Sequence, residues 1–246
     1  MGKRFKVLSI DFDFFQNVTK EQLNNYPDGV DVSTDLSSII WGRYYVEGSE
    51  SKEMIESVTL NRILYCQMLS IIAQQNESIP VMVANSHKHI YNFIKDNMDD
   101  RPLSIFNVDL HHDIFNDRST LDCGNWVRHI KNEYPDAYIH WIARPISMEC
   151  YGIDAEEMHI ELDFEKIKNV EFDAIFLCRS DPWTPPHLDM FFDRMLGLIS
   201  ATFTNARAEK SILQPRDLTE IIEAESKMFK ELQRRMKKDV SSDAIT

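Results

Sequence analysis

The sequence lacks any apolar run that approaches the length needed to cross a bilayer. No long apolar segment follows the basic first six residues, so a signal peptide is not expected either. The four cysteines, Cys66, Cys123, Cys150 and Cys178, are widely separated and form no C-x-x-C pair. This spacing predicts reduced, mostly buried thiols in a cytoplasmic protein.

Positive charge is also scarce, because 27 basic residues face 40 acidic ones and the net charge is −13. This balance argues against nucleic acid or an anionic membrane surface as the main partner. It is compatible with a cationic substrate or with bound divalent metal. The chain shows no internal repeat, low-complexity block or convincing linker. We therefore expect one domain over residues 1–238 and a disordered tail over residues 239–246.

Apolar runs alternate with segments of helical spacing along the chain. Buried strands are predicted at residues 6–15, 79–84, 103–110, 138–143 and 173–178, with a short one at 158–162. Helices are predicted at residues 53–75, 89–97, 125–132, 188–203 and 217–238, and an irregular segment at residues 17–48. The alternation predicts a single α/β domain with a mostly parallel central sheet flanked by helices.

The segment NVDLHHDIFN, residues 107–116, holds three potential metal ligands at alternating positions: Asp109, His111 and Asp113. If this segment is extended, the three side chains project to one face, whereas His112 faces away and is not expected to be a ligand. An apolar run leads directly into the motif, so a metal pocket at the end of a strand is one interpretation. The alternative is a polar loop whose carboxylates cap a helix.

Two further strand ends carry the same kind of residue. Asp11 and Asp13 follow the first apolar run, and their mutual repulsion requires a nearby cation. The alternative is that Asp13 caps a helix while Asp11 pairs with an arginine. His87 follows the run at 79–84, where open α/β sheets place their ligands. Six oxygen and nitrogen donors exceed what one zinc ion takes, and a carboxylate-rich set suits two Mn²⁺ ions.

These motifs resemble those of a known family. D-L-H-H-D (109–113) followed by C-G-N (123–125) is similar to the D-x-H-x-D and S-G-N signatures of the ureohydrolases, the arginase–agmatinase family, and S-I-D-F-D (9–13) to their S-x-D-x-D. Together with S-H-K-H-I-Y (86–91) and G-N-W (124–126), they resemble most closely the peptide arginases. The resemblance implies an arginase/deacetylase-like fold and a hydrolase that converts arginine in a precursor peptide to ornithine and urea.

The resemblance also implies roles for the six ligands. Asp109 and Asp11 would bridge two Mn²⁺ ions, with His87 and Asp113 completing one site. His111 and Asp13 would complete the other. Asp13 or Asp113 would relay a proton to the leaving amine.

Further residues are expected to bind the substrate. Asp181 would hold the guanidinium group, although a turn-initiating aspartate is an equal alternative, and Trp183 lies in the same loop. Asn116 and Asn125 would orient the substrate or the metal loop, with helix capping as the alternative for Asn125.

The chain departs from the family pattern in two ways. Val127 occupies the position of a family histidine, so either His129 or His112 substitutes for it or the proton is relayed in a different way. S-x-D-x-D also precedes D-x-H-x-D, which implies a rearranged strand order.

Two other functions stay open at this point. One is an agmatinase-like or deacetylase-like metal amidohydrolase that acts on a small substrate. The other is a non-catalytic, metal-stabilised protein whose acidic surface holds a basic peptide. A homo-oligomer is compatible with the sequence, which does not identify the precursor peptide.

Overall fold

A seven-stranded sheet forms the centre of the computed structural model, which describes residues 3–27, 31–115, 119–152, 158–213 and 215–243. The strand order is β7-β6-β5-β1-β8-β4-β9, and every neighbouring pair is parallel. The strands are β1 (Phe5–Asp11), β4 (Val81–Ala84), β5 (Leu103–Val108), β6 (Tyr138–Ile142), β7 (His159–Glu161), β8 (Ala174–Cys178) and β9 (Ala206–Ala208). The predicted α/β class with a parallel sheet is therefore confirmed.

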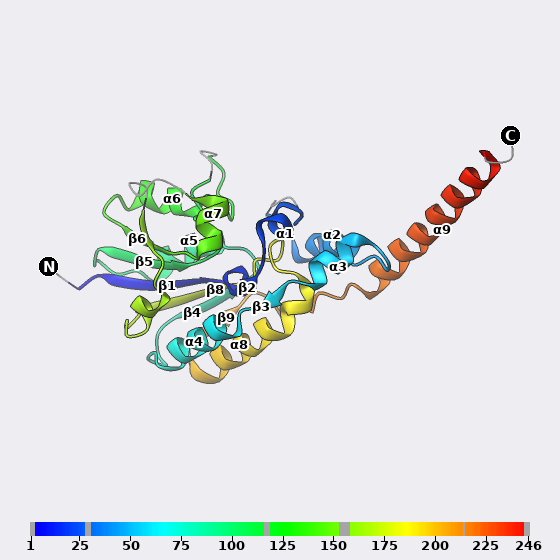
Figure 1. The fold of residues 1–246 in the computed structure, drawn as a ribbon. Helices are drawn as coiled ribbons and strands as arrows, with labels where there is room; N and C mark the ends of the chain where they lie inside the picture. The colour runs from blue at the N-terminus through cyan, green and yellow to red at the C-terminus, as the bar shows by residue number, and fades with distance from the viewer. Residues whose placement is uncertain (1–2, 28–30, 116–118, 153–157, 214, 244–246) are drawn as a thin grey trace.

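Helices cover both faces of this sheet (Figure 1). On one face α4 (Arg62–Ala73) packs against α8 (Asp189–Thr202), and on the other α5 (His89–Asn97) packs against α6 (Trp126–Glu133). A further helix, α7 (Pro145–Tyr151), follows β6, and short 3-10 turns lie at η2 (Phe164–Ile167) and η3 (Pro186–Leu188). Because both faces are covered, the strands are near-continuous apolar runs, which is why they were recognisable in the sequence.

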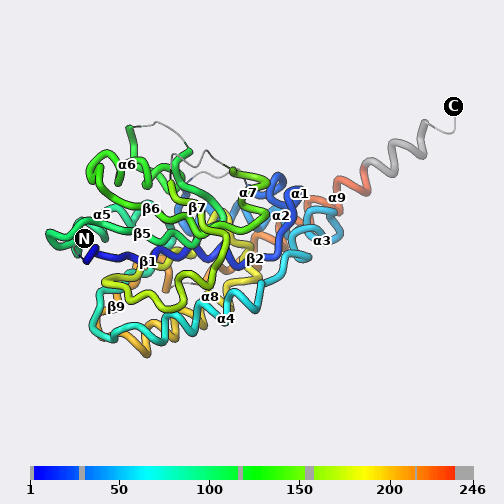
Figure 2. The backbone as a smooth tube through the Cα atoms, turned by 60° about the vertical axis from the view of Figure 1, so that its left-hand side comes forward, coloured from blue at the N-terminus to red at the C-terminus, as the bar shows by residue number. Residues whose placement is uncertain are grey.

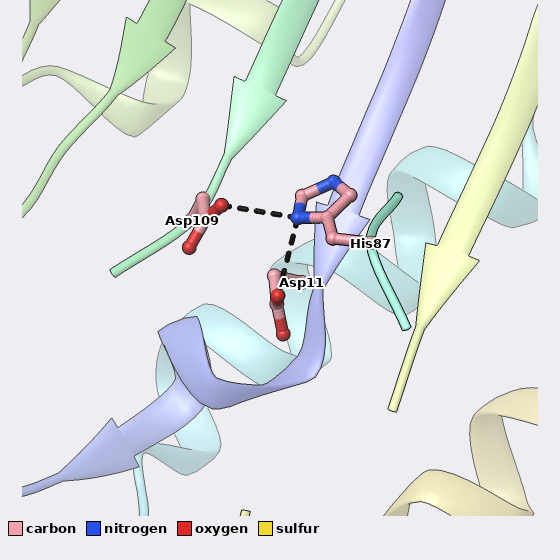
Figure 3. Close-up of side chains that lie close together, drawn as sticks. All are labelled: Asp11, His87 and Asp109. Carbon is pink, nitrogen blue, oxygen red and sulfur yellow. Dashed lines mark ion pairs between the residues drawn. The ribbon is translucent and has the colours of Figure 1, made fainter. Parts of the chain in front are cut away.

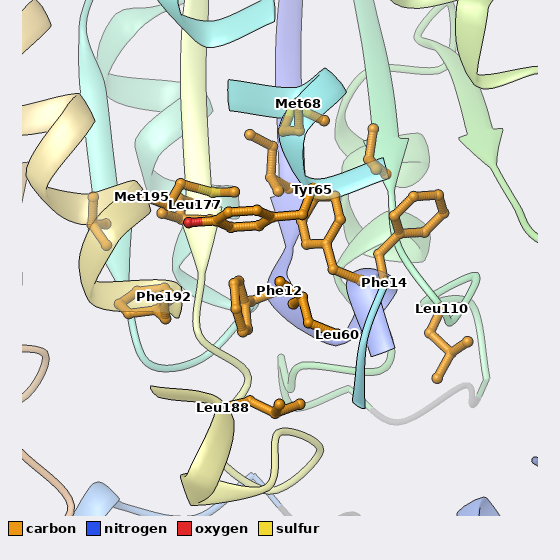
Figure 4. Close-up of a cluster of buried hydrophobic side chains, with 14 of the residues drawn as sticks. Phe12, Phe14, Leu60, Tyr65, Met68, Leu110, Leu177, Leu188, Phe192 and Met195 are labelled. Carbon is orange, nitrogen blue, oxygen red and sulfur yellow. The ribbon is translucent and has the colours of Figure 1, made fainter. Parts of the chain in front are cut away.

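The core has two parts, one on each face of the sheet, and β1 contributes to both. Leu8 and Ile10 point into the cluster below α4 and α8, which is rich in aromatic side chains from the turn after β1 (Figure 4). Phe5 and Val7 point into the cluster below α5 and α6. This alternation fixes the face on which every side chain of β1 lies, including the polar ones.

The segment between β1 and β4 is more regular than predicted. It contains η1 (Phe12–Phe15), α1 (Lys20–Asn24), α2 (Thr34–Tyr44), α3 (Glu50–Glu56) and a two-stranded antiparallel pair, β2 (Gln16–Asn17) with β3 (Thr59–Leu60). The expected irregular loop at 17–48 and the single helix at 53–75 were therefore wrong. The three α-helices begin at side-chain caps, Thr19, Ser33 and Ser49, whose hydroxyls accept backbone N–H groups. Such short, capped helices lack a long apolar stripe, so the periodicity did not reveal them.

The C-terminal helix α9 (Thr219–Asp243) extends away from the rest of the chain (Figures 1 and 2). It includes residues 239–243, which the sequence analysis placed in a disordered tail. Within the described part of the chain, no helix is both long and apolar enough to cross a membrane. Cys178 is buried as expected, but Cys66 is exposed and the other two cysteines are half-buried.

The direction in which strands are added to the sheet reverses beside β1. After β1 the chain passes to β4 on one side of the sheet and then returns to β5 on the other side. In open α/β sheets this reversal leaves a crevice at the carboxyl ends of the central strands, where ligands bind. The helices α1, α2 and α3 lie beyond this same end of the sheet (Figure 1). The carboxyl ends of β1, β5, β4 and β8 are therefore the place to examine for a functional site.

Candidate metal centre

Strand register places Asp11 beside Asp109. β1 and β5 pair in parallel with Ser9 opposite Asn107 and Ile10 opposite Val108. The next pair along the same register is Asp11 with Asp109, at the point where both strands end. Both carboxylates lie on the face of the sheet toward which Val7 points, because residues two apart share a face. The backbone therefore forces two carboxylates together, and both are at least 97% buried.

The remaining motif residues lie on irregular backbone rather than on extended strand. Asp13 is in the 3-10 turn η1, where Asp11 caps the turn by accepting the N–H of Asp13. His111 and Asp113 follow the end of β5, and Asp113 has a left-handed backbone conformation with φ 55°. The extended alternation expected for residues 109–113 was therefore wrong, although the side chains still converge. Left-handed backbone at a non-glycine residue is strained and is often found at functional sites.

His87 reaches this cluster from the loop that follows β4. Its Nδ1 lies 3.2 Å from Asp11 Oδ2 and 3.2 Å from Asp109 Oδ2 (Figure 3). It also lies 3.0 Å from Asp113 Oδ2. None of these approaches has hydrogen-bond geometry, so Nδ1 lacks a hydrogen-bond partner among the described residues. Asp11, His87 and Asp109 thus each offer one ligand atom to a common space, and Asp113 Oδ2 lies beside the His87 nitrogen.

His111 forms a second group on the other side of Asp109. Its Nδ1 lies 3.0 Å from Asp13 Oδ2 and 3.7 Å from Asp109 Oδ1. Asp109 therefore directs one oxygen toward His111 and the other toward His87. Two sets of potential ligands result, Asp11–His87–Asp109 and Asp13–Asp109–His111, and they share Asp109. A carboxylate with one oxygen in each group is the arrangement needed to bridge two ions.

The charge balance of the cluster favours cations. The four aspartates and two histidines are all at least 96% buried, and none of the four carboxylates pairs with lysine or arginine in the part of the chain described. Buried carboxylates without a compensating charge are strongly destabilising. Among the described residues Asp11 therefore has no arginine partner, contrary to the alternative interpretation. When ionised, the four carboxylates carry four negative charges, which two divalent cations would balance.

In the absence of metal, burial and neighbouring charges shift the pKa values of the ionisable side chains in the cluster. Burial and the neighbouring Asp11 carboxylate raise the pKa of Asp13 to about 7. Burial, together with the charge of Asp109, also raises the pKa values of Asp11 and Asp113. For His87 and His111, burial alone would lower the pKa, but the surrounding carboxylates outweigh it and raise both values. Buried ionisable groups whose pKa values are shifted by burial and by neighbouring charges are typical of functional sites.

Polar and aromatic side chains beneath the cluster fix the His87 ring. The other ring nitrogen, Nε2, lies 2.7 Å from the Ser9 hydroxyl. The ring stacks on Phe176 with centroids 5.7 Å apart and also contacts Trp126 at 5.0 Å. The Trp126 indole N–H donates to Asp113 Oδ2, and the Asn107 amide donates to Asp109 Oδ2. Partners of this kind orient ligands and set their basicity.

An aromatic rim surrounds His111. The rings of Tyr151 and Trp183 each lie 4.5 Å from the His111 ring, and Phe115 lies at 6.1 Å. Phe115 is 47% exposed, whereas His111 is 4% exposed. Phe115 therefore contacts both solvent and the His111 ring, and together with Tyr151 and Trp183 it forms an aromatic rim around His111. Aromatic faces bind planar cations such as guanidinium favourably.

Asp181 does not offer a free carboxylate for a substrate. Its two oxygens accept hydrogen bonds from Arg179, at 2.5 Å from Nε and 3.0 Å from Nη2, and both side chains are almost completely buried. The Asp181 carbonyl accepts three more bonds, from Ser37, Trp41 and Arg216. The structure therefore gives Asp181 an internal partner and a position that joins the β8 loop to α2, and its binding of a substrate guanidinium stays a prediction.

The other predicted site residues are distributed differently. The Asn125 side chain orders the preceding loop, accepting from the Asp122 N–H and donating to the Thr120 carbonyl, and it does not cap α6. His129 packs against Tyr91 at 6.2 Å, among the side chains that join α5 to α6, because Trp126 and Ile130 take the inward face of α6. His112 is buried against Phe115 and Trp141, which fits its exclusion as a ligand. Asn116 lies outside the described residues.

Sequence reasoning missed several residues of the site. Ser9 and Asn107 stand two positions before Asp11 and Asp109, and this spacing could have placed them on the same face of the sheet. Trp126 belongs to the G-N-W motif, so it was visible but had no assigned role. Tyr151 carried no local signal, because it reaches His111 only through the packing of α7.

No family model matches the chain, and neither a curated protein nor a solved structure matches it. The geometry of the described residues therefore carries the functional argument.

Proposed function

We propose that the chain is a binuclear manganese hydrolase that converts arginine side chains of a precursor peptide to ornithine with release of urea. The position of Asp109 between the two histidine groups carries this proposal, because its oxygens face His87 and His111 separately. Asp11, His87 and Asp113 would hold one ion and Asp13 with His111 the other, with Asp109 shared. Bound in this way, the two Mn²⁺ ions would supply Lewis-acid activation of water near neutral pH.

The substrate class is proposed from the surroundings of His111. The aromatic rim can stack on a planar cation at the end of a slender side chain, which describes the arginine guanidinium. The net charge of −13 favours the approach of a cationic peptide. With Asp181 already paired to Arg179, the rim residues Trp183 and Tyr151 are the better candidates for positioning the substrate.

Asp13 and Asp113 are the two carboxyl groups of the cluster that are candidates for moving a proton to the leaving amine. Asp113 Oδ2 already accepts a hydrogen bond from the Trp126 indole, whereas Asp13 Oδ2 has no hydrogen-bond partner in the described chain. Asp13 also lies beside His111, the ligand that the aromatic rim surrounds. We therefore assign the proton to the Asp13 carboxyl group, whose oxygen that does not bind the ion would hold it and pass it to the departing nitrogen.

Mass spectrometry of a treated peptide tests the proposal. The purified protein would be incubated with Mn²⁺ and an arginine-containing peptide, and hydrolysis would remove about 42 Da per arginine by the metal-activated water. Release of urea would be assayed in parallel. Asp109→Asn should abolish both signals, whereas Asp100→Asn, an exposed aspartate outside the cluster, should retain them.

Other substrates separate the proposal from its rivals. Turnover of agmatine or free arginine, but not of the peptide, would indicate an agmatinase-like enzyme. Release of acetate from an acetyl-lysine peptide would indicate a deacetylase-like one. Metal-dependent peptide binding without any product would support a non-catalytic binding protein. The free thiols and the membrane-span result are compatible with the proposed cytoplasmic location.

A further inference from the structure

The C-terminal helix α9 is anchored only over its first turns. Ile221 packs against α2 at Gly42, the Ser226 hydroxyl accepts the N–H of Glu47 at 2.9 Å, and Glu225 pairs with Arg43 at 3.6 Å. Beyond Ser226 the helix continues to Asp243 and stands out from the body (Figures 1 and 2). At 1.5 Å per residue this free part is about 26 Å long.

An unsupported helix of this length is only marginally stable in water, because helices in proteins gain most of their stability from packing. The free part of α9 also exposes apolar side chains, Met228 at 55% and Leu232 at 51%. They stand three and seven residues after Glu225, so they share its side of the helix.

This apolar side continues onto α2. Leu36 and Ile39, each 44% exposed, lie on the same side of α2 as Arg43, the residue that pairs with Glu225. Leu36 and Ile39 on α2 and Met228 and Leu232 on α9 thus lie on the helix sides that carry the Arg43–Glu225 pair, and we term these four residues the α2–α9 stripe. Aligned exposed apolar side chains of this kind mark interaction surfaces.

The charge of α9 changes sign along its length. Residues 219–226 contain three acidic residues, Glu220, Glu223 and Glu225, and no basic one. Residues 227–235 contain four basic residues, Lys227, Lys230, Arg234 and Arg235, against one acidic residue. A helix with this distribution is complementary to its own reversed copy.

We propose that the α2–α9 stripe binds the same stripe of a second copy of this chain, with the two α9 helices antiparallel about a two-fold axis. In this arrangement the acidic first half of each helix lies beside the basic second half of the other. A parallel pair would place like charges together. A two-fold contact is also self-complementary, so it closes on itself and does not propagate. Met228 and Leu232 lie near the middle of the helix, where the two helices would cross.

Sedimentation of the full-length protein over a range of concentrations tests the pairing. We expect a dimer whose dissociation constant rises with salt. Leu232→Glu buries a charge at the crossing and should raise the dissociation constant at least about tenfold. Ile63→Glu, which alters an exposed side chain on α4 outside the stripe, should leave it unchanged. A monomer at every concentration, or a dimer insensitive to Leu232→Glu, would overturn the proposal.

Charge exchange provides a second test that does not depend on one substitution. Glu220→Lys with Glu223→Lys gives one helix a basic first half, and Lys230→Glu with Arg234→Glu gives the other an acidic second half. Each double variant alone should be more monomeric than the natural chain, whereas an equimolar mixture should form a mixed dimer. Absence of the mixed dimer, with both variants folded by circular dichroism, would contradict the antiparallel arrangement.

Discussion

Asp109 and Asp11 are neighbours in the sheet, but their contacts differ. Asp109 faces both histidines, whereas the contact of Asp11 is with His87, at 3.2 Å. We expect Asp109→Asn to lose both bound manganese ions and Asp11→Asn to lose the ion on the His87 side first. Elemental analysis of the purified variants measures the stoichiometry independently of activity. Equal loss from both variants would mean that Asp11 bridges as well, as the family resemblance implies.

Ser9 is the residue through which the fold holds the His87 ring. Its hydroxyl lies 2.7 Å from Nε2, so it fixes which way Nδ1 points. We expect Ser9→Ala to weaken manganese binding by about 10–100-fold while the fold survives, as removal of such orienting partners does in other metal sites. Titration calorimetry measures the affinity. Ser104→Ala, a buried serine on β5 remote from the cluster, is the control, and an equal effect of both changes would remove Ser9 from this role.

Because Asp181 pairs with Arg179, we expect substitution of Asp181 to lower the stability of the fold rather than to weaken substrate binding. Asp181→Ala leaves the Arg179 guanidinium buried and unpaired, which costs about 3–5 kcal/mol of unfolding free energy. Urea denaturation measures this loss. Replacing both partners, as in Arg179→Met with Asp181→Leu, should cost less because no charge is left unpaired. A fully stable Asp181→Ala variant with a reduced kcat/KM would instead restore Asp181 to guanidinium binding.

At the scale of elements, the sequence revealed the strands best. β1, β4, β5, β6 and β8 are covered on both sides, so each is a largely apolar run. The convergence of Asp11, His87 and Asp109 followed from the rule that parallel strands bring their carboxyl ends to one edge. The segment from α1 to β3 stayed hidden, since its structure depends on caps and on packing against η1 and α9 rather than on periodicity.

Details of the site depended on tertiary contacts that no local pattern records. The left-handed backbone at Asp113 turns its carboxylate toward His87, and the Trp126 indole holds it there. The pairing of Asp181 with Arg179, two residues earlier, could not be distinguished in the sequence from a carboxylate that faces a substrate. The convergence of the aspartates and histidines was therefore predictable, whereas the residues that support them were not.

Gly42 allows α9 to pack on α2. A methyl group added at this position would lie 2.3 Å from Ile221 Cγ2, so Gly42→Ala forces the two helices apart. We expect a loss of about 1–3 kcal/mol from overpacking and faster proteolysis within α9. Gly197→Ala on α8 meets nothing within 4 Å and should stabilise the helix by up to about 1 kcal/mol. Thermal unfolding of the two variants distinguishes them, and a stable Gly42→Ala protein would contradict this packing.

For the molecule as a whole, the buried cluster links stability to pH and to metal. In the metal-free protein, burial raises the carboxyl pKa of Asp13 to about 7, well above its unfolded value of about 4. A raised carboxyl pKa means that the proton stabilises the fold at low pH, and this contribution is lost as the pH rises from about 4 through 7. Despite burial, nearby carboxylates raise the pKa values of His87 and His111, whose contribution is complete below about pH 6.5 and is lost above it.

Between pH 5 and 8, the titration of these groups lowers the free energy of unfolding as the pH rises. Asp109 does not oppose this change, because its lowered pKa keeps its carboxylate ionised throughout that range. We therefore expect the metal-free protein to unfold at a lower temperature at pH 8 than at pH 6. Manganese needs the deprotonated ligands, so the rise in Tm that it causes should be larger at pH 8. At 100 times the dissociation constant, one site adds about 2.7 kcal/mol. Calorimetric scans in chelator and in Mn²⁺ at both pH values measure the difference, and an equal rise at pH 6 and pH 8 would show that these carboxylates and imidazoles do not bind the ion.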